Sequence, residues 1–477
     1  MSTAKSRIPE FPDGLEWFNA DAPVSLNGQR GRVVLVCFGS FSSIQCQHVL
    51  TDLNYLASKF RKQLTVIGVH TTRFPEEMKR THIQKMLNKH HVRYPVVHDP
   101  ELKLPKRFGI KTTPSQLLVD RDGYIIGALT GDGKLSRLEE VIEYQASRES
   151  KLSAADSQPI SVTQHPEPHS VMSFPGRVLA SRDRIYIADS SHNQILVTSR
   201  QGNILCRYGS TSPGFIDGEG MSAAFNKPQG MALRDQFLYV ADEGNHAIRR
   251  INIRTDEVST VAGTGTAGMV FGSSSSNPVK MQLNSPVDLE LEGGMLYIAM
   301  AGMHQIWGLS LIDNTIKVFA GCGREGLKDG PANIAEFAQP SGLAVYGRHL
   351  YTVDAISSAI RSINLDYGTV STLAGTGLYE YGDADGTESA AKLQNPTAIA
   401  ADMDHRMLWV SDTYNNKIRR VGVKTRHVSS VALNRPLEQP GGLAFHGGTL
   451  YIANTNAHEI LCLNPDKGHA EPLNVTE

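Results

Sequence analysis

The chain lacks the features that mark several common classes of protein. It has no uninterrupted apolar run of the roughly 18 residues that a membrane-spanning helix needs. Its 47 basic residues nearly match its 48 acidic residues, giving a formal net charge of −1. A basic excess that would attract nucleic acid or an anionic membrane is therefore missing. We expect neither of these as a partner.

Cysteine is also scarce. The 477 residues include five cysteines, an odd number spread over the whole chain: Cys37, Cys46, Cys206, Cys322 and Cys462. Such spacing does not suggest a disulfide framework and favours a reducing compartment. Residues 1–14 are polar and contain proline, without the apolar core of a secretory signal. These features predict a cytoplasmic protein.

The first third of the chain alternates strand and helix patterns. Residues 33–38 and 64–69 are apolar runs rich in β-branched residues, which indicates buried strands. Apolar residues follow helical spacing over 45–60, and a second helix is expected from about 75 to 91. Residues 115–127 then have the pattern of a hairpin. The order predicts an α/β domain with helices covering a central sheet.

Two segments make this pattern specific. Residues 38–48 follow a buried strand and open a helix, and residues 109–115 contain Thr113-Pro114. From about residue 27 to 133 the chain resembles the thioredoxin-like family. The resemblance implies a redox motif at 43–46 and a cis peptide bond before Pro114 beside it.

The motif departs from the family at its most important position. Ser43 stands where the attacking cysteine belongs, and Cys46 occupies the second cysteine position. Dithiol exchange requires an exposed thiolate of low pKa, which a serine hydroxyl cannot replace. We therefore expect Ser43, Cys46 and Pro114 to form a degenerate site without a cofactor or a metal, in a non-enzymatic domain.

One catalytic alternative stays open. The Ser-x-x-Cys pattern of Ser43 and Cys46 also resembles peroxiredoxins, in which the cysteine attacks peroxide. That resemblance implies a proline seven residues before the cysteine and an arginine that lowers its pKa. Gly39 occupies the first of these positions, and Pro114 falls near the second. Cys37, inside a predicted strand, is expected to be a small core residue.

Three histidines on the second predicted helix are candidate metal ligands. His82, His90 and His91 lie among basic residues, and no carboxylate or thiol accompanies them at ligand spacing. We expect a solvated helix face here instead of a metal site.

From residue 173 onwards the chain repeats itself. A proline recurs six times, followed about twelve residues later by an aromatic-led strand and then by an isoleucine. The six prolines are Pro175, Pro228, Pro286, Pro340, Pro396 and Pro440. Repeats of 40–60 residues with four short strands each predict a six-bladed β-propeller. We expect a thioredoxin-like domain over 1–147, a linker over 148–172 and the propeller over 173–477.

The pattern Tyr-Val-Ala-Asp-x-x-Asn-x-x-Ile-Arg at 239–249 resembles the NHL repeat. The whole chain is similar to proteins that combine a thioredoxin-like domain with NHL repeats. How the ring closes stays open: residues 470–475 supply a fourth strand of the last blade, or residues 161–163 join the ring.

An acid and a base vary together in these repeats. Asp242, Asp354 and Asp412 each precede an arginine by seven residues, namely Arg249, Arg361 and Arg419. In other repeats both partners change, as in Met300 with Trp307 and Asn454 with Leu461. This predicts structural charge pairs across a hairpin. Asp189 is followed by Leu196, so it must have another partner.

The links between blades are expected to carry the function of the propeller. The first four links are long and the fifth is short, which favours a protein or peptide ligand on this asymmetric face. Asp383 to Glu388 superficially resembles part of a calcium loop, and His246, His304 and His458 recur at one repeat position. We expect turn residues and not metal ligands in both cases. The leading hypothesis is a non-enzymatic interaction protein, and the alternative is a thiol-based redox enzyme that uses Cys46.

Overall fold

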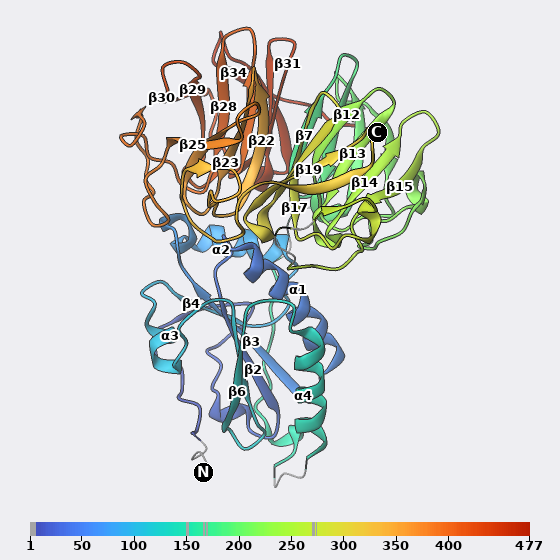
Figure 1. The fold of residues 1–477 in the computed structure, drawn as a ribbon. Coiled ribbons are helices and arrows are strands. Elements are labelled where there is room, and N and C mark those ends of the chain that lie inside the picture. The colour runs from blue at the N-terminus through green and yellow to red at the C-terminus, as the bar shows by residue number, and fades with distance from the viewer. Residues whose placement is uncertain (1–5, 149–151, 166, 168–169, 270–271, 273) are drawn as a thin grey trace. The chain divides into compact units, whose positions relative to one another are not determined.

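The computed structural model divides the chain into two compact units, Met1–Pro168 and His169–Glu477, which are described separately below (Figure 1). The structure describes residues 6–148, 152–165, 167, 170–269, 272 and 274–477. Parts of the expected linker and of the link over 268–277 lie outside these ranges. Within them, no helix is long and apolar enough to cross a membrane.

The first unit is built on a mixed sheet with the strand order β1-β4-β3-β2-β5-β6. Its strands are β1 (Glu16–Phe18), β2 (Val33–Gly39), β3 (Leu64–Thr71), β4 (Val96–Asp99), β5 (Ser115–Val119) and β6 (Ile125–Thr130). Its α-helices are α1 (Ile44–Lys59), α2 (Arg80–Lys89), α3 (Lys103–Phe108) and α4 (Leu135–Ser147). Strands β2, β3 and β4 are parallel, as the predicted strand–helix alternation requires.

The two faces of this sheet are covered by different helices. Side chains alternate along β2, so Leu35 packs in one cluster with residues of α1, α2 and α4. Val36 packs in the other cluster with residues of α3. Because both faces are covered, β2 and β3 are nearly continuous apolar runs, which is why they could be recognised in the sequence.

The second expected helix is interrupted. Residues Pro75–Met78 form a 3-10 turn, Lys79 is extended with ψ 128°, and α2 begins at Arg80. The carboxylate of Glu77 accepts hydrogen bonds from the backbone N–H groups of Arg73 (2.7 Å) and Phe74 (3.1 Å). These bonds satisfy donors at the start of the 3-10 turn and hold it as a separate element.

In its described residues, the second unit contains six antiparallel sheets, each built from a meander of four strands. The first three sheets contain β7 (Arg177–Ala180), β8 (Arg184–Asp189), β9 (Gln194–Ser199), β10 (Ile204–Tyr208); β12 (Pro228–Arg234), β13 (Phe237–Asp242), β14 (Ala247–Asn252), β15 (Glu257–Ala262); and β17 (Pro286–Glu292), β18 (Met295–Met300), β19 (Gln305–Ser310), β20 (Thr315–Ala320). The last three contain β22 (Pro340–Tyr346), β23 (His349–Asp354), β24 (Ala359–Asn364), β25 (Thr369–Ala374); β27 (Ala398–Asp402), β28 (Met407–Asp412), β29 (Lys417–Gly422), β30 (His427–Ser430); and β31 (Pro440–His446), β32 (Thr449–Asn454), β33 (Glu459–Asn464), β34 (His469–Pro472). The predicted six-bladed propeller is confirmed.

Four blades carry an additional short strand taken from the link that precedes them. These strands are β11 (Gly218–Glu219), β16 (Ser274–Ser275), β21 (Gly330–Pro331) and β26 (Gly386–Thr387), and each pairs with the outermost strand of its blade. In the first blade, Thr476 takes this place through a bridge to Asn203. The innermost strands contact their neighbours in turn, including β31 with β7.

The ring of blades is therefore closed by contacts between the two ends of the repeat region, in the last and the first blade. Strand β34 is the ordinary fourth strand of the last blade, and the following residues continue to the first blade. The other possibility, that residues 161–163 join the ring, is wrong. Ser161 and Thr163 donate hydrogen bonds to Asp21 of the first unit instead.

Neighbouring blades are joined by one recurring hydrogen bond. At one position of each blade an Asn, Ser or His side chain accepts a bond from the backbone N–H just before the recurring proline. The pairs are Asn193 with Lys227, His246 with Ser285, His304 with Gln339, Ser358 with Asn395, Asn416 with Gln439 and His458 with Phe174. The donor residues all have positive φ, from 46° to 69°. The bond thus helps to hold a backbone conformation that non-glycine residues rarely adopt.

A single arginine connects several blades. The guanidinium of Arg177 donates to the carbonyl oxygens of Ser341 (2.7 Å) and Thr397 (2.9 Å). It also donates to Gly441 at 3.3 Å and lies 3.8 Å from a carboxylate oxygen of Asp288. These contacts belong to different blades around the ring, so the side chain occupies the centre of the propeller.

Candidate functional site

The segment in which the resemblance places the redox motif connects β2 to α1. Ser43 is the N-cap of α1, and its Oγ accepts a hydrogen bond from the Cys46 backbone N–H at 3.5 Å. Serine is among the preferred residues at this position because its short side chain can satisfy a free N–H of the first turn. The hydroxyl at residue 43 therefore serves the helix end.

Cys46 lies in the first turn of α1 and is only 5% exposed. Its Sγ packs against Gly39, where an added Cβ would lie 3.1 Å from the sulfur. Burial, with a smaller contribution from the nearby carboxylates Glu77 and Asp132, raises the pKa of the Cys46 thiol to about 11, although hydrogen bonds from Ser40 and Ser43 act in the opposite direction. Cys37 is buried as expected, and burial raises the pKa of its thiol as well. Both residues are thiols at neutral pH.

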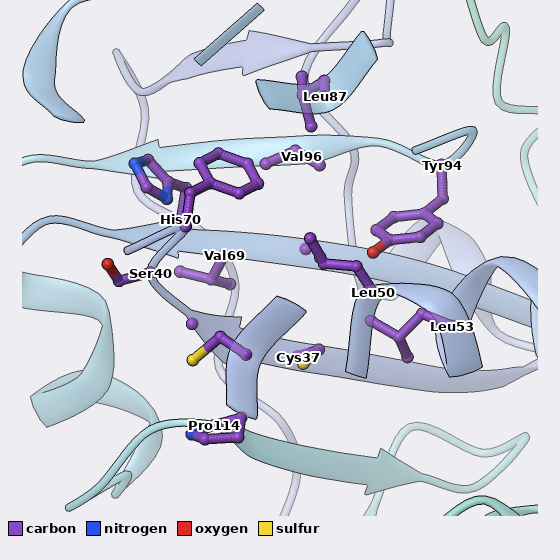
Figure 2. A pocket seen from close by; sticks show the side chains of 14 residues that line it. Cys37, Ser40, Leu50, Leu53, Val69, His70, Leu87, Tyr94, Val96 and Pro114 are labelled. Carbon is purple, nitrogen blue, oxygen red and sulfur yellow. The ribbon is translucent and has the colours of Figure 1, made fainter. Parts of the chain in front are cut away.

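The structure brings Cys46 and Pro114 together. The Thr113–Pro114 peptide bond is cis, as the resemblance implied. Pro114, Cys37 and Cys46 line one small cavity of about 30 Å³, whereas Ser43 is not among its lining residues (Figure 2). The cavity is otherwise walled mainly by apolar side chains and leaves space for about one water molecule.

A buried carboxylate organises the segment before the motif. Glu77 Oε1 accepts hydrogen bonds from Ser40 Oγ (2.6 Å) and the Ser42 backbone N–H (3.0 Å). Its other oxygen binds the backbone of Arg73 and Phe74. Burial raises the pKa of Glu77, and these hydrogen bonds lower it. Glu77 could not be found from the sequence, because its partners Ser40 and Ser42, in the connection between β2 and α1, are more than thirty residues away.

The expected solvated histidine face is wrong. His82 and His90 are buried, while His91 is exposed. Phe41 stacks on the ring of His70 with centroids 4.5 Å apart, and His70 stacks on His98 at 5.5 Å. Burial lowers the pKa of His70 and of His82 to about 3, so both rings are neutral at neutral pH. Among the described residues, no group of three or more His, Cys, Asp or Glu side chains could hold a metal ion.

The predicted charge pairs of the propeller are confirmed. Arg249 Nη1 lies 2.8 Å from Asp242, Arg361 Nη1 3.7 Å from Asp354, and Arg419 Nη2 2.7 Å from Asp412. All six side chains are fully buried. They are structural, because they lie inside the blades.

Each of these arginines has a second acidic partner that the sequence analysis missed. Asp217 contacts Arg249 at 2.7 Å, Asp329 contacts Arg361 at 2.9 Å, and Asp385 contacts Arg419 at 2.7 Å. These aspartates belong to the links, so they do more than form turns. Asp383 and Asp385, which lie in the segment that resembles part of a calcium loop, bind Lys417 and Arg419 instead.

Two blades that lack the Asp–Arg pair, the first and the third, have a glutamine five residues after the position of the recurring aspartate. In the first blade Gln194 donates to Asp189 at 2.8 Å, and His192 Nδ1 lies 2.9 Å from Asp189 as well. In the third blade Trp307 Nε1 donates to Gln305 at 3.0 Å. Where an arginine is present, this position is Ala, Ala or Lys. Comparing this column between repeats would have identified the partner of Asp189.

Exposed apolar side chains gather on the links. The first four links carry Phe215, Ile216, Met221, Met269, Val279, Ile334 and Tyr379 among their exposed large apolar residues. The fifth link, which the structure describes completely, adds no large exposed apolar side chain. The asymmetry expected from link length thus has a chemical counterpart.

Comparison with known proteins gives consistent results. A family model described as thioredoxin-like matches residues 31–125. The chain is 32% identical to human NHL repeat-containing protein 2, over 95% of this chain and 69% of that protein. It is 33% identical to the Arabidopsis thaliana protein SUPPRESSOR OF QUENCHING 1, chloroplastic, over 98% of this chain and 48% of that protein. A shorter match, 23% identical, covers 28% of this chain and 89% of the Bacillus subtilis thiol-disulfide oxidoreductase YkuV.

Proposed function

Since the chain belongs to the family of NHL repeat-containing proteins with a thioredoxin-like domain, we propose that it is a non-enzymatic interaction protein. In this proposal the thioredoxin-like site is degenerate, and the propeller binds a protein or peptide partner. The site carries no exposed thiolate at its helix N-terminus, and this single observation supports the first part most strongly.

The chemistry of residues 43 and 46 supports an inactive site. Ser43 cannot form a mixed disulfide, and its hydroxyl caps α1. Cys46 is buried, and its thiol has a pKa of about 11. Because only the thiolate attacks disulfides or peroxide, the fraction of reactive sulfur at pH 7 is on the order of 10⁻⁴.

The experiment is a comparison of wild type, Ser43→Cys and Cys46→Ser in insulin reduction and in peroxide consumption. We expect wild type and Cys46→Ser to be inactive in both assays. Ser43→Cys restores a partly exposed thiol at the N-terminus of α1 and should gain insulin reduction. Wild-type activity that matches Ser43→Cys, or peroxide consumption lost in Cys46→Ser, would refute the inactive site.

The proposed binding surface of the propeller consists of the exposed apolar side chains on its first four links. In an antiparallel meander, these links leave the blade at the same end as the turns between the second and third strands. Ile216 is 55% and Tyr379 77% exposed, and such residues are typical of interface centres when they gather on one face. The partner that such a surface suits is a protein or peptide with an apolar anchor residue.

Capture of a partner by immobilised full-length protein tests this surface. Ile216→Ser and Tyr379→Ser should each reduce the amount of partner retained. The matched controls are Ile312→Ser and Tyr367→Ser, which are each 82% exposed but lie in turns between third and fourth strands, at the opposite end of the blades. Equal loss in both sets would argue against a binding face on the links.

A thiol-based redox enzyme is the second candidate. It is favoured by the position of Cys46 and cis-Pro114 on one cavity, which preserves half of a dithiol site. The similarity to YkuV, whose name is that of a thiol-disulfide oxidoreductase, points the same way. The charges near Cys46 are carboxylates, which oppose formation of a thiolate.

For location, we propose the cytoplasm. The five cysteines, all in described parts of the chain, are free thiols, which suits a reducing compartment. The near balance of charge supports the further proposal that neither nucleic acid nor a membrane is a partner.

A further inference from the structure

We propose that the first unit has a second binding site, for a small organic anion, in a cavity between the end of α1, strand β3 and residues 157–162. The cavity has a volume of about 340 Å³, far larger than the 30 Å³ beside Cys46. This volume lies at the lower end of the range for small-molecule pockets.

Three arginines line this cavity: Arg32, Arg61 and Arg93. No Asp or Glu lines it, and in the described part of the chain none of the three forms an ion pair. Arg61 and Arg93 are exposed at their positions. Guanidinium groups without an acidic partner around one hollow favour an anionic ligand, because Arg61 and Arg93 can each donate two parallel hydrogen bonds to a phosphate, sulfonate or carboxylate and Arg32 adds its charge.

Arg32 is held in place before any ligand binds. Its Nε donates to Thr65 Oγ1 at 2.9 Å, and its terminal nitrogens donate to the carbonyl oxygens of Arg61, Lys62 and Leu64. Burial lowers the pKa of its guanidinium, because removal from water disfavours the charged form. An anion in the cavity would offset that effect.

The remaining walls indicate that the ligand also has an apolar part. Ala57, Leu64 and Val66 line one side, and Ile160 and Val162 line the side formed by the segment after α4. That segment is fixed by a hydrogen bond from Gln29 Nε2 to the Gln158 carbonyl oxygen at 3.0 Å. A ring or short chain with one anionic group satisfies both the charge and the walls.

The site is independent of the proposed function, since neither Ser43 nor Cys46 lines it. Tyr94 lines both cavities, and Figure 2 shows its side chain beside the cavity near Cys46. Binding of an anion can therefore be measured whether or not Cys46 has redox activity.

Isothermal titration calorimetry on the full chain tests the proposal with phenyl phosphate, benzenesulfonate and benzoate. These probes share one ring and differ in the anionic group. We expect at least one to bind, and we expect Arg61→Gln and Arg93→Gln each to weaken its binding by about tenfold or more, as for other charge-assisted hydrogen bonds. Arg137→Gln, an exposed arginine of α4 outside the cavity, is the matched control and should bind like wild type.

Four results would overturn the proposal. They are the absence of binding for all three probes, unchanged binding in both cavity variants, equal weakening in Arg137→Gln, and binding of phenol as tight as that of the best anion. Inorganic phosphate should bind more weakly than phenyl phosphate, since it leaves the apolar walls uncovered; equal affinity would contradict the organic part of the ligand. Because Arg61 and Arg93 are both exposed, either variant alone keeps the test valid if the other does not fold.

Discussion

The two units bury their polar side chains in opposite ways. The propeller buries charges in pairs, as in Arg249 with Asp242 and Arg419 with Asp412. The thioredoxin-like unit buries neutral groups, including the rings of His70 and His82 and the thiol of Cys46. Glu77, the most deeply buried of its carboxylates, is bound by backbone N–H groups and a serine hydroxyl, not by a cation.

This difference has a physical basis. A buried ion pair requires that both partners be present, so acid and base change together between blades. A buried histidine or thiol needs no charged partner, because burial shifts its pKa so that the group stays uncharged. The first kind of burial leaves a pattern in a repeated sequence, and the second does not.

The largest effect is expected from breaking one charge pair. Asp242→Ala leaves Arg249 fully buried and still charged, since arginine does not lose its proton at accessible pH. The expected loss is about 3 kcal/mol in the free energy of unfolding, measured by urea denaturation followed by circular dichroism. Asp404→Ala, at an exposed aspartate in a turn of the fifth blade, should change it little. A loss below about 1 kcal/mol for Asp242→Ala would mean that the contact with Asp217 compensates Arg249 fully.

The second-largest effect is expected from acid, which should destabilise the first unit. Burial, followed by the nearby charge of His98 for His70 and His70 for His82, lowers both pKa values from 6.5 to about 3. The unfolded chain then binds more protons than the native state between these pH values, so stability is complete above pH 6.5 and falls as the pH drops towards 3.

When the pH falls from 7 to 5.5, protonation of the two histidines in the unfolded chain should lower the free energy of unfolding of the first unit by on the order of 2 kcal/mol. Hydrogen exchange followed by mass spectrometry resolves peptides of the first unit and so measures this loss separately from the propeller. His70→Phe keeps an aromatic ring against Phe41 and should make the pH dependence shallower. An unchanged slope in this variant would assign the acid sensitivity to other groups.

A smaller loss is expected from Glu77→Gln. The amide nitrogen would face N–H or O–H donors at one of the two oxygen positions, which removes hydrogen bonds and costs about 1–2 kcal/mol. Faster hydrogen exchange at residues 42, 73 and 74 is the specific readout. Glu101→Gln, whose side chain is 65% exposed, serves as the control. Unchanged protection at all three amides would show that Glu77 does not organise this segment.

The smallest effect should come from giving the second blade the residues of the third. The triple variant Asp242→Met, Ala247→Gln, Arg249→Trp copies Met300, Gln305 and Trp307 and leaves no buried charge unpaired. We expect a loss of about 1 kcal/mol or less by urea denaturation, since apolar replacement of both partners is often neutral. A loss as large as that of Asp242→Ala would mean that the pair itself, and not its completeness, stabilises the blade.

The same contrast explains how much of the molecule could be predicted from the sequence. Six copies of one pattern allowed the blades and the pairs at Asp242, Asp354 and Asp412 to be recognised from the sequence alone. The link aspartates, such as Asp217 and Asp329, were missed because they pair with an arginine more than thirty residues later, after the links vary in length.

In the first unit, the positions of Ser43, Cys46 and Pro114 followed from the resemblance, but the burial of His82 and His90 did not. Their helix carries many basic residues, and nothing nearby in the sequence indicates which face is covered. The apolar residues Ile83, Met86 and Leu87 share that burial, so the packed face of α2 is wider than its apolar residues alone suggest. The cavity with Arg32, Arg61 and Arg93 also depends on the path of residues 157–162, which composition described only as linker.

The side chain of Arg177 affects whether a molecule can pass through the centre of the propeller. It donates hydrogen bonds to carbonyl groups of the fourth and sixth blades and to that of Thr397, just before the fifth blade. The side chain therefore crosses the axis of the ring. An extended peptide could pass through the middle only if these hydrogen bonds broke. We therefore expect a ligand of the propeller to bind on one of its faces without passing through the ring.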